Sequence, residues 1–351
     1  MCLKNIEKLR ERLSDHPKPV VIVTHDNPDP DAIAASLGMR RIVQSINPDV
    51  ECDVIYGGEI SHPQNKTLMN VLGVNITTKR DVFEGEAEKK DYEEKYGTVI
   101  VVDTIPERCL PKGIKAFLTI DHHRNETKNS ELQDIREVGA SASIVWEYMA
   151  SQTIKLSADV DTDSSLATAM LVGIKTDTQD LVSENTKDID FTSYKHLLEY
   201  VNRRQLSSII NYPIPPYHFD LRSKLDNPEN FKIDNGVFVG GLGYMMSSRR
   251  DAIATLAEER ARMEGVDTAF VFGIVDDCIV ASVRSNGVAV DVNALCQRIF
   301  GKEYGGGKMN AGAARVPLSN FLFDVTDCNK EKMWDAIKSC LIEVILKKTQ
   351  E

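Results

Sequence analysis

The sequence PVVIVTHDNPDPDA, residues 19–32, joins a short apolar run to a dense cluster of polar residues. Residues 20–23 are apolar and β-branched, a pattern typical of a fully buried strand in a parallel sheet. One histidine and three aspartates follow within residues 25–31, and the helix-forming run AIAASLGMRRIV comes directly after them. Because open α/β sheets bind ligands at the carboxyl ends of their strands, the stretch predicts such a sheet with a polar site at that edge.

A single aspartate in this stretch would need no ligand, since Asn27, Asp29 or Asp31 can simply cap the following helix. Several carboxylates beside His25 are harder to explain by capping. Clustered charges repel one another and lose hydration unless a cation offsets both effects. We therefore expect a cation at this edge of the sheet.

Apolar runs and amphipathic segments alternate over residues 1–211, which indicates a doubly wound, mostly parallel sheet of the α/β class. The predicted strands are 19–24, 50–56, 98–104 and 116–123. The predicted helices are 3–14, 31–46, 62–72, 140–151, 162–175 and 187–211.

The stretch NYPIPPYHF contains three prolines, at 213, 215 and 216, and predicts a linker over 212–218. It separates a first domain, 1–211, from a second, 219–351. The second domain carries the strand-like runs GVFVGGLGYM, TAFVFGIVDD and CIVASVRS and ends in the helical run MWDAIKSCLIEVILKK. This pattern predicts a smaller α+β domain, which we expect to face the first across a cleft.

Composition restricts the classes of partner. A net charge of −11 argues against a protein that grips duplex DNA, which requires a basic face. The seven cysteines form no C-x-x-C pair, which disfavours a thiolate zinc site and suits free thiols in the cytoplasm. The charged amphipathic start does not resemble a signal peptide, and we expect no membrane association.

Three further segments carry acidic or imidazole side chains at the ends of predicted elements. Asp103 ends the strand VIVVDT, Asp121-His122-His123 ends FLTIDHH, and Asp177 ends the helix-like run MLVGIKTD. Each residue alone is more often a cap or a member of an ion pair. Clustering these aspartates and histidines without partners would carry a large cost, because the groups lose hydration and the carboxylates repel one another. Two divalent cations would balance four carboxylates.

The residue types also restrict the metal. Aspartate and histidine without cysteine favour Mn²⁺, Fe²⁺ or Co²⁺ over structural zinc, with Mg²⁺ as an alternative. Two such ions about 3.5–4 Å apart are a common device for phosphoryl hydrolysis. We take Mn²⁺ as the first expectation.

The motifs HDNPDPD, VVDT, DHH and GIKTDT, in this order, resemble those of the DHH superfamily of phosphoesterases. The last third of the chain, through SVRS followed by GGGKMNAG, resembles the DHH-associated domain of that family. The resemblance spans nearly the whole chain. It points to the branch of nanoRNases, 3′-phosphoadenosine 5′-phosphate phosphatases and cyclic-dinucleotide phosphodiesterases.

This resemblance implies a role for each matching residue of the first domain. The implied ligands are His25, Asp29 and Asp103 for one cation and Asp31, Asp103, His122 and Asp177 for the other. A water or hydroxide between the cations would attack phosphorus. His123 would face the scissile phosphate as a catalytic residue, Asp103 would bridge the cations, and Asp121 would orient a ligand histidine.

The glycine-rich run YGGGKMNAGAA, residues 304–314, allows two interpretations: a phosphate-binding loop or a tight glycine turn. It is not a Walker A loop, because the pattern G-x-x-x-x-G-K-[ST] is not met. In the resembled family the run reads Gly-Gly-Gly-His and binds the end of the substrate remote from the metals. Gly305, Gly306 and Gly307 match, and Lys308 replaces the histidine, which implies retained phosphate binding with altered base preference.

Arg284 and Ser285, within SVRS, match the family's substrate-contacting pair. Arg284 would clamp a phosphate through two hydrogen bonds. The alternative for this residue is an ion pair with Asp291 at the end of the strand.

The leading functional prediction is a Mn²⁺-dependent phosphohydrolase of short nucleotides. It would act as a phosphodiesterase on dinucleotides such as pApA and cyclic di-AMP, and as a phosphatase on 3′-phosphoadenosine 5′-phosphate. An inorganic pyrophosphatase or exopolyphosphatase is the alternative within the same chemistry. A non-catalytic nucleotide-binding regulatory protein is the alternative from another class. The resemblance also favours a homodimer.

Overall fold

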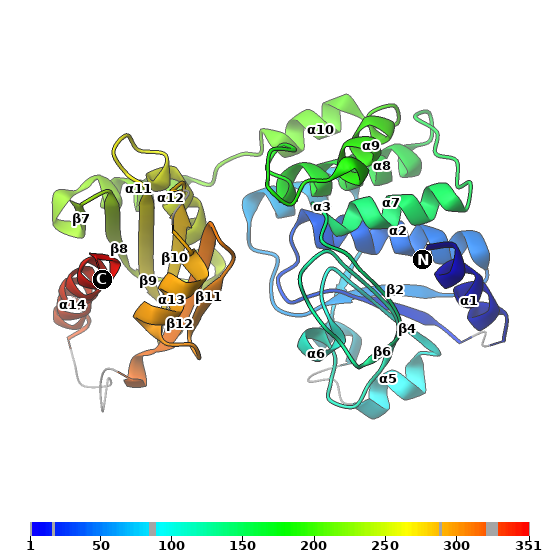
Figure 1. Ribbon diagram of the computed structural model, residues 1–351, viewed down its shortest axis with the longest axis horizontal. Coiled ribbons are helices and arrows are strands. Elements are labelled where there is room, and N and C mark those ends of the chain that lie inside the picture. Colours follow the sequence, from blue (N-terminus) through cyan, green and yellow to red (C-terminus); the bar gives the residue numbers. More distant parts are fainter. Residues whose placement is uncertain (1, 16–17, 84–88, 288–289, 321–328, 351) are drawn as a thin grey trace. The chain divides into compact units, whose positions relative to one another are not determined.

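The computed structural model describes residues 2–15, 18–83, 89–287, 290–320 and 329–350. The chain divides into two compact units, Met1–Pro213 and Ile214–Glu351, each built on a six-stranded sheet (Figure 1). The predicted linker spans 212–218, but its residues from Pro216 onward belong to a helix that begins there. Among the described residues, no helix combines the length and the apolar character needed to cross a membrane.

The first unit contains a parallel sheet with the strand order β3-β2-β1-β4-β5-β6. Its strands are β1 (Val20–Val23), β2 (Cys52–Tyr56), β3 (Thr77–Thr78), β4 (Thr98–Val102), β5 (Ala116–Asp121) and β6 (Ser130–Ile135). The chain winds outward from β1 to β3 and then returns to place β4 beside β1. The order therefore reverses between β1 and β4, and such a reversal opens a ligand-binding crevice in doubly wound sheets.

Helices cover both faces of this sheet. They are α1 (Cys2–Asp15), α2 (Pro30–Ile46), α3 (Pro63–Leu72), α4 (Lys79–Phe83), α5 (Lys89–Lys95), α6 (Pro106–Cys109), α7 (Ser141–Ser151), α8 (Asp161–Asp177), α9 (Asp188–Leu197) and α10 (Arg203–Ile210). Val20 and Ile22 pack into the larger core with α2, α7 and α8, whereas Val21 and Val23 pack on the opposite face with Tyr92 of α5. The β-branched run of β1 is thus buried on both sides, as its sequence predicts.

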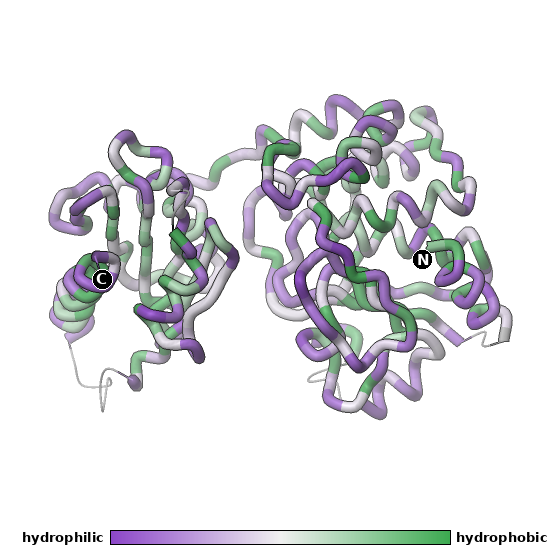
Figure 2. The backbone as a smooth tube through the Cα atoms, viewed as in Figure 1, coloured by the Kyte–Doolittle hydropathy of each residue, from purple (hydrophilic) through white to green (hydrophobic). Residues whose placement is uncertain are grey.

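The second unit contains a mixed sheet with the order β11-β12-β10-β9-β8-β7, in which only β8 and β9 pair in parallel among the described strands. Its strands are β7 (Phe231–Asp234), β8 (Val237–Met245), β9 (Thr268–Val275), β10 (Cys278–Ser285), β11 (Gly305–Gly307) and β12 (Ala311–Pro317). Its helices are α11 (Pro216–Asp226), α12 (Ala252–Ala261), α13 (Val292–Phe300) and α14 (Lys330–Gln350). Figure 2 shows hydrophobic residues along its central strands and hydrophilic residues in many of the loops.

The predicted fold class, a parallel α/β sheet with a second, smaller α+β domain, is confirmed. Several elements were not predicted, among them β3, α4, α5 and α6. The single helix expected over 187–211 is two helices, because the side chain of Asn202 caps a new one through the amides of Arg204 and Gln205. Strand β6 was not predicted, since Asp134 is its one fully buried residue and the strand lacks apolar alternation.

Candidate metal centre

The carboxyl ends of β1, β4 and β5 deliver polar side chains to one edge of the first sheet. His25 lies two residues beyond β1, Asp103 directly follows β4, and His122 directly follows β5. Asp103 adopts a left-handed backbone conformation, with a φ of 57°, which turns the chain sharply at the end of its strand. Since the three strands are neighbours in a parallel sheet, their ends meet.

Two helices bring further carboxylates to the same edge. Asp29 caps α2 by accepting a hydrogen bond from the amide of Ala32, 2.9 Å away. Asp31 lies in the first turn of that helix. Asp177 is the last residue of α8. The helix capping expected for this stretch is therefore present. It explains the position of Asp29 but not that of Asp31.

The potential ligand atoms form three overlapping groups, each with its atoms within 4.8 Å of one another. The groups are His25, Asp29 and Asp103; Asp31, His122 and Asp177; and Asp103, His122 and His123. All six metal ligands implied by the resemblance thus lie together. Asp103 and His122 each belong to two groups, so the site has the form of two neighbouring positions with shared residues.

His25 and His122 each point Nε2 toward a carboxylate and donate a hydrogen bond from Nδ1 to a backbone carbonyl. His25 Nδ1 donates to the carbonyl of Asp26 at 2.8 Å, and His122 Nδ1 donates to that of Val138 at 3.1 Å. His122 Nε2 is buried and makes no hydrogen bond within the described residues, although an oxygen of Asp177 lies 2.9 Å away. A neutral imidazole fixed in this way presents its Nε2 lone pair to a metal.

The charges of the site are unbalanced without a cation. Burial, together with the charges of Asp103 and Asp177, raises the pKa of Asp29 and of Asp31. Burial of His25 opposes protonation, but the carboxylates of Asp103 and Asp29 outweigh it and raise its pKa to about 10. Buried carboxylates this close together need positive charge beside them, and the donor set fits divalent ions.

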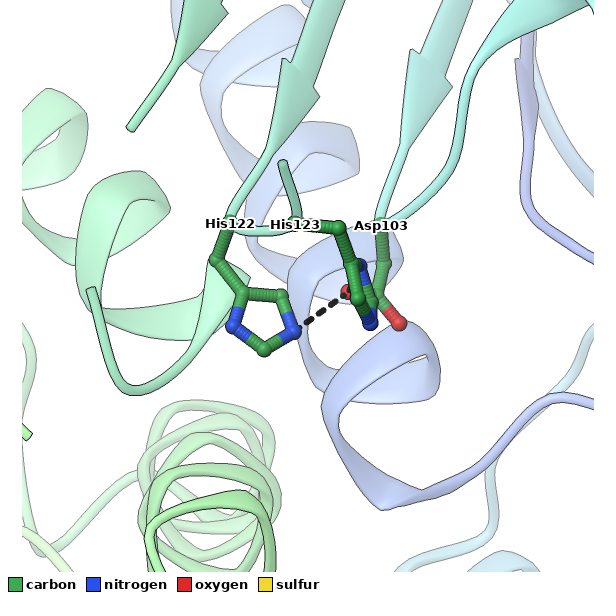
Figure 3. A group of neighbouring side chains, drawn as sticks. All are labelled: Asp103, His122 and His123. Carbon is green, nitrogen blue, oxygen red and sulfur yellow. Dashed lines mark ion pairs between the residues drawn. The ribbon is translucent and has the colours of Figure 1, made fainter. Parts of the chain in front are cut away.

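His123 differs from His122 in its surroundings. Figure 3 shows both rings beside Asp103. His123 Nδ1 donates to Asp121 at 2.8 Å, and Asn125 donates to the other oxygen of the same carboxylate at 2.7 Å. Burial favours the neutral acid, but these donors lower the pKa of Asp121. Asp121 thus orients His123, whereas the expected partner was a ligand histidine.

The residues expected to bind substrate in the second unit have diverse surroundings. Ser285 is buried, and its hydroxyl donates to the carbonyl of Asp267 at 3.0 Å. Arg284 Nη1 donates to Ser282 Oγ and to the carbonyl of Val283, both at 2.9 Å. Within the described part of the chain, no ion pair joins Arg284 to Asp291.

Asp291 instead caps α13 by accepting a hydrogen bond from the amide of Ala294. The ion pair that was the alternative for Arg284 is therefore not formed. Arg284 is the second-last residue of β10 and pairs with Ala311 of β12.

The glycine run forms the edge strand β11. Gly305 leaves no room for a side chain, because a Cβ there would lie 2.6 Å from the carbonyl of Cys296 in α13. The amide of Gly307 donates to the side chain of Asn293 at 3.0 Å, and the amide of Lys308 donates to the carbonyl of Ala311 at 2.7 Å. The amides of Gly307 and Lys308 are thus engaged in hydrogen bonds within the protein. The side chain of Lys308 is the exposed cationic group of the run.

Sequence reasoning missed Ser141. Its hydroxyl donates to Asp103 at 2.9 Å, and its amide donates to Asp31 at 2.7 Å. A serine in the first turn of a helix is common, so the sequence carries no distinctive signal for this role.

Comparisons with known proteins bear on the family of the chain. The family profile described as "DHH family, N-terminal domain" matches residues 19–174. An uncharacterized protein of Methanocaldococcus jannaschii is 31% identical over 355 residues, which cover 99% of this chain and 68% of that protein. The cyclic-di-AMP phosphodiesterase of Listeria monocytogenes is 27% identical over 335 residues, which cover 89% of this chain and 46% of that protein.

The crystal structure of an exopolyphosphatase-related protein from Bacteroides fragilis has the same fold. It aligns with a TM-score of 0.69 at 16% identity, over 99% of this chain and 98% of that one. The fold, the matched motifs and the clustered ligands lead to one conclusion: the chain belongs to the DHH family of metal-dependent phosphoesterases and carries a second, mixed-sheet domain.

Proposed function

We propose that this protein hydrolyses phosphoester bonds of short nucleotides. The substrates would be dinucleotides, such as pApA and cyclic di-AMP, and the bisphosphorylated nucleoside 3′-phosphoadenosine 5′-phosphate. The proposal is carried by one observation, the sharing of Asp103 and His122 between neighbouring groups of potential ligands. Two cations held in this way, Mn²⁺ first among them, supply charge neutralisation and a bound water of lowered pKa.

The protein's own residues position the reacting groups. Asp103 turns Oδ2 toward His25 and Oδ1 toward His122, so its carboxylate would be able to hold a cation on either side. His123 is not needed by either set of implied ligands, and its ring lies beside Asp103. Because the Asp121 carboxylate accepts from Nδ1, a doubly protonated His123 would have its Nε2 proton left to give to the leaving oxygen.

The choice of a nucleotide substrate has separate support. The alignment with the Listeria phosphodiesterase covers 89% of this chain, so it includes most of the second unit. In that unit, Arg284 of β10 and Lys308, which directly follows β11, supply positive charge; β12 lies between these two strands. We infer that they bind the phosphate or nucleotide end remote from the metals, and that Lys308 alters the base preference. Ser285 and the glycines Gly305, Gly306 and Gly307 shape that surface.

The direct test is product release from a substrate panel in Mn²⁺. The panel holds pApA, cyclic di-AMP, a trinucleotide, 3′-phosphoadenosine 5′-phosphate and pyrophosphate, with EDTA as the metal-free control. Cleavage of dinucleotides to mononucleotides is the expected result. Preference for pyrophosphate would identify the pyrophosphatase alternative. Nucleotide binding without turnover in the presence of metal would identify the regulatory alternative.

A further inference from the structure

The segment Val138–Ala142, here called the ligand cradle, connects β6 to α7 and contacts three of the implied metal ligands. The carbonyl of Val138 accepts a hydrogen bond from His122 Nδ1. The amides of Ser141 and Ala142 donate to the two oxygens of Asp31 at 2.7 and 2.9 Å. The cradle therefore fixes groups that the sequence places far apart.

The cradle also sets the direction of a third ligand. Ser141 Oγ donates to Oδ1 of Asp103, which leaves Oδ2 toward His25 at 3.4 Å. The amides that hold Asp31 belong to the amino-terminal end of α7, where the helix dipole stabilises negative charge. Both carboxylates are thus oriented before a metal arrives.

Asp190 accepts a hydrogen bond from the backbone of the cradle, at Gly139. This residue is fully buried in the first turn of α9. Its Oδ2 accepts hydrogen bonds from the amides of Gly139 and Lys187, each at 2.8 Å. The bond to Lys187 is ordinary capping of α9, but the bond to Gly139 spans 51 residues of sequence and has no part in capping.

Close packing reinforces this contact. A Cβ on Gly139 would collide with the side chains of Thr178 and Asp190. Thr178 is fully buried and directly follows the implied ligand Asp177. Gly139 is therefore packed between Asp190 and Thr178 at the end of α8. A displacement of Asp190 would displace Gly139 and, with it, the rest of the cradle.

We propose that Asp190 is a positioning residue of the metal centre, acting through Gly139 on the ligand cradle and thereby on Asp31, Asp103 and His122. The inference rests on the proposed metal-dependent function. Loss of partners that orient metal ligands typically lowers metal affinity about 10–100-fold.

The test compares three variants by Mn²⁺ calorimetry and by the absorption spectrum of bound Co²⁺. Asp190→Ala removes the acceptor of both amides. Asp190→Asn keeps an amide oxygen in the place of Oδ2. Asp163→Ala is the matched control, because Asp163 is also buried in the first turn of a helix and accepts from the amide of Ser157. It lies 14 residues from Asp177 on α8, about 21 Å along the helix.

We expect Asp190→Ala to lower Mn²⁺ affinity about 10-fold and to change the Co²⁺ spectrum. Asp190→Asn should restore both, and Asp163→Ala should lower the unfolding temperature without changing either. Unchanged affinity and spectrum in a folded Asp190→Ala protein would overturn the inference. So would an equal loss in Asp163→Ala, which would indicate general destabilisation.

Ser141→Ala keeps the test decisive if Asp190→Ala fails to fold. It removes only the hydroxyl bond to Asp103 and retains the backbone amide that holds Asp31. We expect a changed Co²⁺ spectrum, and an unchanged one would overturn the role of the cradle. A wild-type protein that binds no Mn²⁺ or Co²⁺ would instead contradict the proposed function.

Discussion

Oδ1 of Asp103 lies 3.5 Å from Nε2 of His122, and the second oxygen of the same carboxylate faces the opposite side of the site, toward His25. Asp103 is almost completely buried at the point where the strand order reverses. A carboxylate in this position can serve two cations at once, which a neutral side chain of the same shape cannot do.

Asp103→Asn is therefore expected to lower turnover of a dinucleotide by at least about 100-fold, more than the loss of an orienting partner causes. Its Mn²⁺ stoichiometry should fall below that of the wild type. Activity assays and metal analysis of the dialysed protein give the two readouts. Full activity with unchanged stoichiometry would refute the shared-ligand arrangement.

His123→Ala should behave differently, because His123 is held by Asp121 and is not needed as a metal ligand. We expect kcat to fall about 10²–10⁴-fold while Mn²⁺ affinity is retained, as for the loss of a general acid. Steady-state kinetics and calorimetry on the same preparation separate the two quantities. A parallel loss of metal would show instead that His123 is a ligand.

Asp121→Asn tests the contact between Asp121 and His123 by changing the carboxylate in place of the histidine. An amide can instead donate to His123 Nδ1, which would leave that atom without a proton. It would also remove the carboxylate charge that stabilises a doubly protonated ring, and so would weaken His123 as a general acid. We expect a lower kcat, a changed pH profile of kcat, and unchanged KM and Mn²⁺ affinity. A pH profile identical to that of the wild type would mean that Asp121 only holds the loop through Asn125.

The clustering of the implied ligands could be predicted from sequence because each of them lies just beyond a buried strand or at a helix end. Asp103 after TVIVV and His122 after AFLTID are examples. Parallel strands bring such ends together whatever the loops do. The order of the strands, and hence the reversal between β1 and β4, required the structure.

The supporting residues could not be predicted in this way. Ser141 resembles any helix-start serine, and Asp190 resembles an ordinary capping residue of α9. Their roles depend on the packing of α7 and α9 beside the sheet, which no local pattern encodes. Strand β6 was missed for a related reason, since its polar sequence SELQDI is set by its place at the sheet edge.

Metal affinity should rise with pH. Protonated His25, whose pKa is raised to about 10 in the metal-free site, must lose its proton before Nε2 can bind a cation. Calorimetry in buffers with different ionisation heats should show proton release on Mn²⁺ binding between about pH 6 and pH 8. Affinity that does not change with pH would contradict this protonation state.

The same shift predicts the pH dependence of stability. Because the folded pKa of His25 lies above its ordinary value of 6.5, its stabilising contribution is complete below about pH 6.5. It is lost as pH rises toward about 10. In EDTA, the unfolding temperature should therefore fall over this range, and Mn²⁺ should raise it most at the alkaline end. Equal stabilisation by Mn²⁺ at every pH would count against the link.

Lys308→Ala tests the second unit separately from the metals. The side chain is exposed beyond β11, and its loss removes a charge without disturbing the amide bond to Ala311. If the lysine binds a substrate phosphate, KM for pApA should rise about 10-fold, as for the loss of a charge-assisted hydrogen bond. Mn²⁺ affinity should not change, and Lys302→Ala, another exposed lysine close by in the sequence, provides the control. An unchanged KM would remove Lys308 from the substrate site, whereas loss of Mn²⁺ would show that the residue supports the fold.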